Sequence, residues 1–266
     1  NNTVALDASL YSSASNLGTI EVKAKNGTIA MVAGDYSSAG NRGKISMEFS
    51  GKTTGDQIMG MYADTNSSIT NSGTISAKAD NASGKVTGMQ ARLTGYYADF
   101  VNTASNGGEI NLAGSSNDGS ALSLWGMSSW LDKAFVKSNQ SAEKLDKATL
   151  INNGTVTLSL ALQKSDEEGA TVDNPLSLAN GTGGIVGIHA DARTDAANNG
   201  LISITVSGDG GESIAAGMQA VRGGNIVNDK NIEITSEGSA YGMMAVSGAN
   251  SGSNFTNVES SVINKG

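Results

Sequence analysis

The stretch NSGTISA at residues 71–77, followed by GMQA at residues 88–91, contains the two phrases that decide the fold of this chain. In the first phrase Ile75 and Ala77 stand two positions apart, as do Met89 and Ala91 in the second. Apolar residues at alternate positions are typical of a β-strand with one buried face. We therefore expect each phrase to form a short strand whose apolar side chains point to one side.

Both phrases recur along the chain. The first phrase begins at Asn16, Asn41, Asn71, Asn106, Asn152, Asn198 and, in degenerate form, Asn228, and its last copy breaks off after Asn264. The second begins at Gly60, Gly88, Gly187, Gly217 and Gly242, with weaker copies at Ala30 and Gly126. A third segment of two apolar or β-branched residues precedes the Asn in several copies, as at Leu150 and Ile151. Copies of the first phrase are roughly 25 to 46 residues apart, as insertions between repeated units would give.

Three short strands per unit predict a solenoid. One unit buries too few side chains to be stable alone, because ordering each residue costs about 1–2 kcal/mol. Units stacked in register form interior ladders of equivalent residues, and each strand pairs with the units above and below. The sequence thus predicts an all-β, three-sided parallel β-helix of about seven or eight coils, as a single domain over residues 1–266. A β-propeller is disfavoured because its blades need four strands and the chain has few aromatic residues.

Composition excludes several function classes. The formal net charge of −8 argues against a nucleic-acid partner and against an anionic membrane surface. The chain has no Cys and one His, which excludes thiolate chemistry and a metal site built from several His. No apolar run is long enough for a membrane helix. We expect no metal, no cofactor and no membrane insertion, and we interpret the Met in the second phrase as an interior ladder.

The tandem N-x-G-T-I-x-V and G-M-x-A phrases, in a Gly-rich chain free of Cys, resemble the passenger domains of Gram-negative autotransporters. The resemblance covers nearly the whole chain. It implies a right-handed β-helix that is exported through the outer membrane and is displayed at the bacterial surface or secreted. We see no signal peptide, and the chain stops within a repeat, so we expect a fragment of a longer protein.

The function that this resemblance implies is adhesion, and hence a role in virulence. The expected partners are a host surface receptor, a matrix protein or a glycan, or another copy of the chain. Two alternatives remain open. The chain is an inert stalk that carries a protease or toxin domain elsewhere in the parent protein, or it is a polysaccharide-processing β-helix enzyme.

Three interruptions of the repeat are expected to be insertions, at about residues 113–147, 163–184 and 247–260. The first contains Trp125 and Trp130, the two Trp of the chain, and a helical pattern in which Trp130, Ala134 and Phe135 share a face behind a Ser129 cap. It is either an aromatic protrusion that contacts a ligand or a helix packed on the rod. The second is a solvated acidic loop or a Ca²⁺ site, and the third is a Ser/Gly/Asn-rich loop.

A candidate binding face follows from the second phrase. The residue between Met and Ala points away from the core, which gives a row of Val32, Tyr62, Gln90, Ser128, His189, Gln219 and Met244. We expect a flat, solvated face that contacts a receptor or a second copy through Tyr62, Gln90, His189 and Gln219, although any solvated rod needs polar outer faces. The matching outer row of the first phrase is Glu21, Ser46, Ser76, Asn111, Thr157, Ser203 and Glu233.

One constellation suggests catalysis. His189, Asp191 and Arg193 stand at alternate positions after Gly187, close to Asp195, and would place an acid, a base and a cation on one outer face. The region lacks flanking aromatic residues, and the chain has no G-x-S-x-G phrase. We therefore expect that the chain is not an enzyme.

Overall fold

The computed structural model describes residues 3–25, 27–93, 99–116, 122–131, 146–162, 184–208, 214–246 and 259–266. Of these, residues 52–57 are described by their backbone alone. These residues form three parallel sheets, two of eight strands and one of seven. The all-β prediction and the three-sided parallel β-helix are confirmed. No helix in the described ranges is long and apolar enough to cross a membrane.

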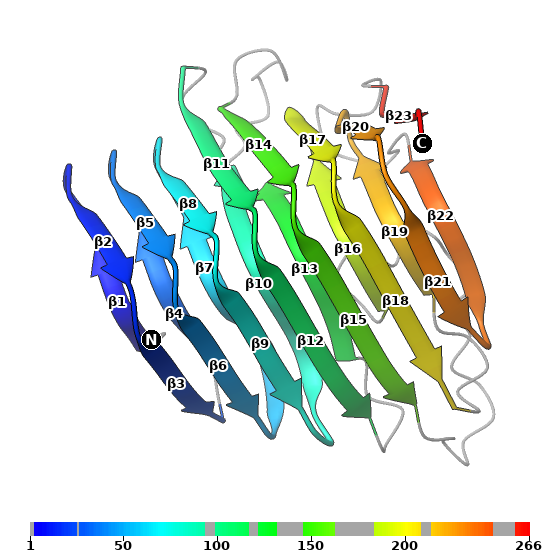
Figure 1. Cartoon of the computed structure of the whole chain (residues 1–266), viewed down its shortest axis with the longest axis horizontal. Coiled ribbons are helices and arrows are strands. Elements are labelled where there is room, and N and C mark those ends of the chain that lie inside the picture. The colour runs from blue at the N-terminus through cyan, green and yellow to red at the C-terminus, as the bar shows by residue number, and fades with distance from the viewer. Residues whose placement is uncertain are drawn as a thin grey trace.

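The chain visits the three sheets in the order A, B, C and then starts the next coil (Figure 1). Sheet A contains β1 (Thr3–Ala8), β4 (Thr28–Ala33), β7 (Lys52–Ala63), β10 (Ser83–Leu93), β13 (Leu122–Leu131), β16 (Gly184–Asp191), β19 (Ile214–Val221) and β22 (Ser239–Val246). Sheet B contains β2 (Ser13–Asn16), β5 (Ser38–Asn41), β8 (Ser68–Asn71), β11 (Val101–Asn106), β14 (Lys147–Asn152), β17 (Thr194–Asn198), β20 (Asn225–Asn228) and β23 (Ser261–Asn264). Sheet C contains β3 (Thr19–Ala24), β6 (Lys44–Phe49), β9 (Thr74–Ala79), β12 (Glu109–Ser116), β15 (Thr155–Leu162), β18 (Leu201–Ser207) and β21 (Ile232–Ser236).

The core lies between the sheets and consists of ladders of equivalent apolar residues. The Met of the second phrase pair in register along sheet A, and Ile188 takes the place of Met in β16. Ile75, Ile110, Val156 and Ile202 form the matching ladder of sheet C, and all four are buried. The predicted interior ladders are therefore confirmed.

The Asn that begins the first phrase has a structural role at the end of each sheet B strand. Its side-chain Nδ2 donates to Oδ1 of the equivalent Asn in the next coil, at 2.8 Å between Asn71 and Asn106. The same Nδ2 also donates to a backbone carbonyl, that of Glu109 in the case of Asn71. The ladder runs without a break from Asn16 to Asn264. Each buried amide is thereby satisfied, as buried polar groups must be.

The Gly of the first phrase is required by close approach of neighbouring coils at the corner after sheet B. A Cβ added at Gly73 would lie 2.0 Å from the carbonyl oxygen of Gly43. Equivalent glycines in later coils meet the same obstacle. The N-x-G phrase therefore encodes one corner, in which Asn bonds along the rod and Gly lets the coils stack.

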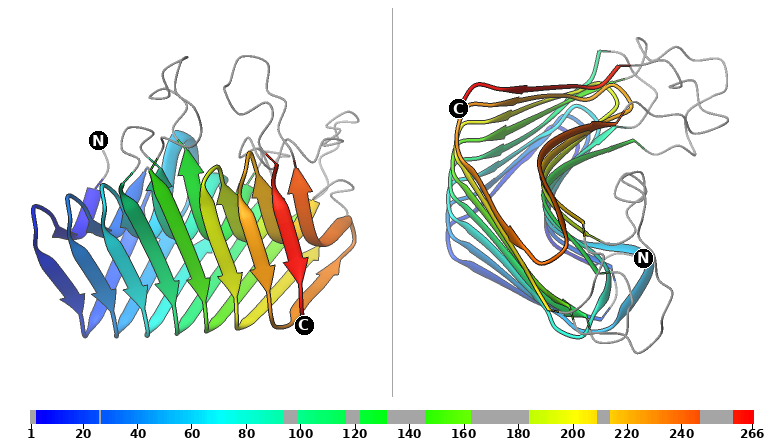
Figure 2. Two further views of the ribbon diagram at one scale, coloured as in Figure 1. Left: turned by 90° about the horizontal axis from the view of Figure 1, so that it is seen from above. Right: turned by 90° about the vertical axis from the view of Figure 1, so that its right-hand side faces the viewer.

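The Gly of the second phrase marks a bend in sheet A. The strands of this sheet curve so that their outer side is concave (Figure 2). At the bend, a Cβ on Gly187 would lie 2.4 Å from the carbonyl oxygen of Gly217 and 2.6 Å from Cγ2 of Ile202. Glycine thus lets sheet C side chains press against the inner side of sheet A, and it separates two outward-facing rows on the concave side.

The structure differs from the sequence prediction at the first insertion. Residues 113–116 end β12, and Trp125 and Trp130 both lie on β13, which is a regular strand of sheet A. The helix expected from a Ser129 cap is wrong at its start, because Ser129 and Trp130 are strand. Residues 117–121 and 132–145 lie outside the described residues, as do 163–183 and 247–258 of the other two expected insertions.

Candidate functional site

The row predicted from the second phrase exists as a ladder on the concave side of sheet A. Gln90 of β10 pairs in register with Tyr62 of β7 and with Ser128 of β13. Ser128 then pairs with His189, His189 with Gln219, and Gln219 with Met244. The structure thus brings the four candidate residues Tyr62, Gln90, His189 and Gln219 together in one line.

The expectation that this row is solvated is wrong. Gln90 is 3% exposed, and Ser128, His189 and Gln219 are fully buried. Tyr62 is partly buried, and burial raises the pKa of its hydroxyl, with the nearby Asp64 as the second cause. The row that remains accessible is the one on sheet C, where Ser46, Ser76 and Thr157 are half-buried or exposed. Alternation along a strand determines the side on which a residue points and does not determine whether water reaches that side.

A second apolar cluster, separate from the core, lies on the same concave side. It consists of Trp125, Val186, Ile214, Ala216 and Met244, with Trp130 and Val246 packed against it. Trp125, Val186 and Ala216 each directly precede the bend glycine of their strand and pair in register. The ring centroid of Trp125 lies 4.3 Å from that of the His189 imidazole and 6.1 Å from that of the Trp130 indole.

Lys85 of β10 lies over these aromatic rings. Its Nζ is 3.3 Å from the ring centroid of Trp125 and 4.5 Å from that of Trp130. Burial lowers the pKa of the Lys85 amine to about 7, and the nearby Asp191 opposes that shift. A cation over an indole face is stabilised by the ring quadrupole, which offsets part of the lost hydration.

His189 is held as a neutral imidazole. Burial lowers its pKa to about 4, against a smaller opposing effect of Asp191. Nδ1 lies 2.9 Å from Oε1 of Gln219, whose Nε2 is in turn directed to the sulfur of Met244. Because an amide oxygen only accepts, Nδ1 carries the proton and Nε2 is left as an acceptor.

Asp191 forms an ion pair at the end of β16. Arg222 Nε donates to Asp191 Oδ1 at 2.7 Å, and its Nη2 contacts Oδ2. The backbone N–H of Leu131 donates to Oδ2 at 3.1 Å. Both partners of the pair are buried, so the Arg222 guanidinium compensates the charge of the carboxylate and holds it in place.

The catalytic arrangement considered from the sequence does not form as expected. β16 ends at Asp191, and the chain turns at Ala192, whose φ is +41°. Arg193 therefore does not continue the row of His189 and Asp191. Asp195 lies on β17 of sheet B and accepts a hydrogen bond from Asn225. The two carboxylates thus stand on different sheets with different partners.

Sequence reasoning missed Lys85, Thr87 and Arg222. Thr87 directly precedes Gly88 and pairs with Trp125, so extending the row of residues before each bend glycine would have found it. Lys85 could have been noticed as a charged residue inside a strand two positions further back. No spacing rule points to Arg222, which lies in a corner with φ of +50°.

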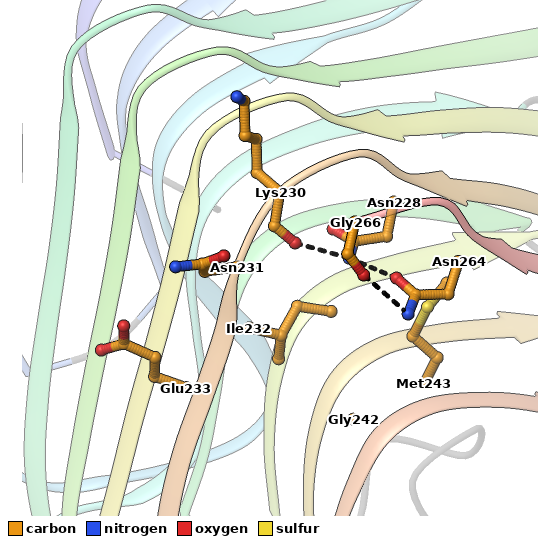
Figure 3. Close-up of a pocket in the computed structure, with 9 residues that line it drawn as sticks. All are labelled: Asn228, Lys230, Asn231, Ile232, Glu233, Gly242, Met243, Asn264 and Gly266. Atoms are coloured by element: carbon orange, nitrogen blue, oxygen red, sulfur yellow. Dashed lines mark hydrogen bonds between the residues drawn. The ribbon is translucent and has the colours of Figure 1, made fainter.

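Two further features do not make sites. A hollow beside β21 is lined by Asn228, Asn264, Ile232 and Met243 among others (Figure 3), and the two Asn are the last members of the ladder, already hydrogen bonded. The rings of Tyr11 and Tyr36 stack in the corners between sheets A and B, with their centroids 5.0 Å apart, and both residues are exposed. Among the described residues, no three His, Asp or Glu side chains gather as a metal site would need.

Comparison with known proteins gives one similarity. Residues 5–72 match the family model described as the BigA third pectate lyase-like domain, a domain of bacterial surface proteins. No curated protein and no solved structure matches the chain. The match agrees with the parallel β-helix, and it supports a β-helical domain of a bacterial surface protein with an extracellular or surface location.

Proposed function

We propose that the chain is an adhesive segment of an autotransporter passenger domain, which attaches the bacterium to host surfaces or to neighbouring cells. The similarity of residues 5–72 to a domain of bacterial surface proteins is the observation that carries this proposal. The partner is a host receptor, a matrix protein or glycan, or a second copy of the chain.

A stalk and an adhesin share the same scaffold and differ in what their outer side offers. On sheet C the accessible row is made of small polar side chains such as Ser46, Ser76 and Thr157, which suit a solvated rod. On sheet A the outer side carries a buried cluster of aromatic and polar residues instead. A rod that only spaces other domains has no need of such a cluster, and this difference between faces favours the adhesin over the inert stalk.

We also propose that the chain is not an enzyme. Asp191 is engaged by Arg222 and by the backbone N–H of Leu131, so its carboxylate is not free to act as a general acid or base. Asp195 stands on another sheet. A polysaccharide-processing activity would need two such groups to converge on one bond.

The test uses beads coated with the purified chain, because multivalent display reveals weak contacts. Coated beads should bind an epithelial monolayer, or aggregate with one another, more than beads coated with albumin. An inert stalk predicts neither effect. Release of reducing sugar from a polysaccharide panel, abolished by Asp191→Asn, would replace the adhesin with the enzyme.

A further inference from the structure

In the part of the chain that the structure describes, buried polar atoms without hydrogen-bond partners gather at one place. Among the described residues, six such side-chain atoms stand out, and all lie on the concave side of sheet A. They are Nζ of Lys85, Oγ1 of Thr87, Oε1 of Gln90, Nε1 of Trp125, Oγ of Ser128 and Nε2 of His189. In contrast, the Asn ladder on sheet B pairs its buried amides throughout.

The six atoms belong to three neighbouring strands and form one cluster. Thr87 pairs with Trp125 across β10 and β13, and Gln90 pairs with Ser128, which pairs with His189 of β16. Lys85 and His189 both contact the indole of Trp125. Leaving a buried polar group unpaired costs free energy, so a cluster of them indicates a missing partner rather than chance.

The chemistry of the atoms identifies the class of that partner. The ammonium form of Lys85 and the Trp125 indole can only donate, Gln90 Oε1 and His189 Nε2 can only accept, and the Thr87 and Ser128 hydroxyls do both. A carboxylate or phosphate would leave the acceptors unpaired, and an ammonium group would leave the donors unpaired. Hydroxyl groups satisfy both kinds, and the adjacent indole of Trp130, which is only partly buried, offers apolar surface to the C–H groups of a sugar.

We propose that this cluster is a binding site for a neutral sugar unit of a glycan. The proposal rests on the proposed adhesive function in one respect: the sugar would be part of the receptor, a surface glycan. It is nevertheless measured on the purified chain without cells, so its failure leaves the adhesion test untouched.

Trp125 belongs to the cluster and Trp130, the other Trp of the chain, lies beside it, so tryptophan emission reports on the cluster directly. Tryptophan emission is followed while the methyl glycosides of galactose, glucose, mannose and N-acetylglucosamine are added in turn. Galacturonate and inorganic phosphate serve as anionic probes. With at least one neutral glycoside, the emission should change with concentration until it reaches a plateau, and Tm should rise. The anions should have neither effect.

The variant Thr87→Val separates a ligand site from a structural network. It keeps the shape of the side chain and removes the unpaired hydroxyl, so Tm should be equal to or above that of the wild type. The apparent affinity for the glycoside should fall at least about fivefold, the loss of one hydrogen bond. Thr157→Val, at an exposed position of sheet C, is the matched control and should change neither quantity.

Three results would overturn the proposal. If no glycoside changes the emission or Tm, the cluster is hydrated and binds no sugar. If galacturonate or phosphate alone binds, Lys85 marks an anion site. If Thr87→Val lowers Tm, the hydroxyl has a structural partner and the cluster is part of the scaffold.

Discussion

The side-chain Nδ2 of Asn106 donates to Oδ1 of Asn152 at 2.8 Å, although 46 residues separate the two in sequence. The bond between Asn16 and Asn41 has the same length across a separation of 25 residues. Insertions of different size therefore leave the stacking of the corners unchanged. The solenoid absorbs variation in its loops and keeps a constant register at each sheet.

Asn106→Leu should destabilise the chain strongly. The substitution leaves Nδ2 of Asn71 and Oδ1 of Asn152 without their ladder partner, and each buried group so orphaned costs about 1–3 kcal/mol. We expect the free energy of unfolding in urea to fall by about 2–5 kcal/mol in total. Asn111→Leu, on the accessible row of sheet C, is the control and should change it by less than about 0.5 kcal/mol. A small effect at both positions would show that the Asn ladder contributes little to stability.

Met218→Asp tests the direction in which the second phrase points. Met218 is fully buried in the core ladder, so the variant buries an unpaired carboxylate and should lose about 3–5 kcal/mol or fail to fold. Thr157→Asp, at an exposed position of sheet C whose register partners Asn111 and Ser203 are uncharged, should melt like the wild type. Thermal denaturation followed by circular dichroism measures both. Wild-type melting of Met218→Asp would place that residue outside the core.

Gly73→Ala should be far more costly than Gly18→Ala, although both glycines occupy the same position of the first phrase. The added methyl group meets the Gly43 carbonyl oxygen at Gly73, whereas nothing lies within 4 Å of a Cβ at Gly18. We expect a clear drop in Tm for the first variant and little change for the second. Equal Tm values would mean that the corners are not as closely stacked as described.

His189, as the single His of the chain, gives an unambiguous proton NMR signal. Its burial lowers the pKa to about 4, so the imidazole should remain neutral where an ordinary His is already protonated. The unfolded chain takes up the proton below pH 6.5 and the folded chain does so only near pH 4, so stability should fall as the pH drops through this range. In His189→Gln this part of the pH dependence should vanish. Titration near 6.5 would show a solvated ring.

The sequence was sufficient for the scaffold because the ladder positions repeat. Ile75, Met89 and their equivalents recur with fixed neighbours, and period-two alternation then predicts which side of each strand is buried. The register of Gln90 with His189 through Ser128 follows from the same alignment of phrases. These features depend on local spacing, which can be determined from a single sequence.

The candidate site was harder to predict because it depends on the bend in sheet A and on burial of an outer face. The sequence pattern predicts Trp125 in an insertion, since the phrase at Gly126 is weak and the spacing from Asn106 to Asn152 is long. The ion pair of Asp191 with Arg222 joins the end of β16 to the turn after β19 and leaves no pattern in the sequence. Contacts of this kind follow from tertiary packing and not from periodicity.

Whether the cluster on sheet A holds the receptor is measured by the adhesion to an epithelial monolayer of beads that carry the wild-type chain, Thr87→Val or Thr157→Val. We expect that the wild type and Thr157→Val adhere equally, whereas Thr87→Val loses most of the adhesion while remaining folded. Equal adhesion of all three chains, or none above that of albumin-coated beads, would contradict adhesion through this cluster.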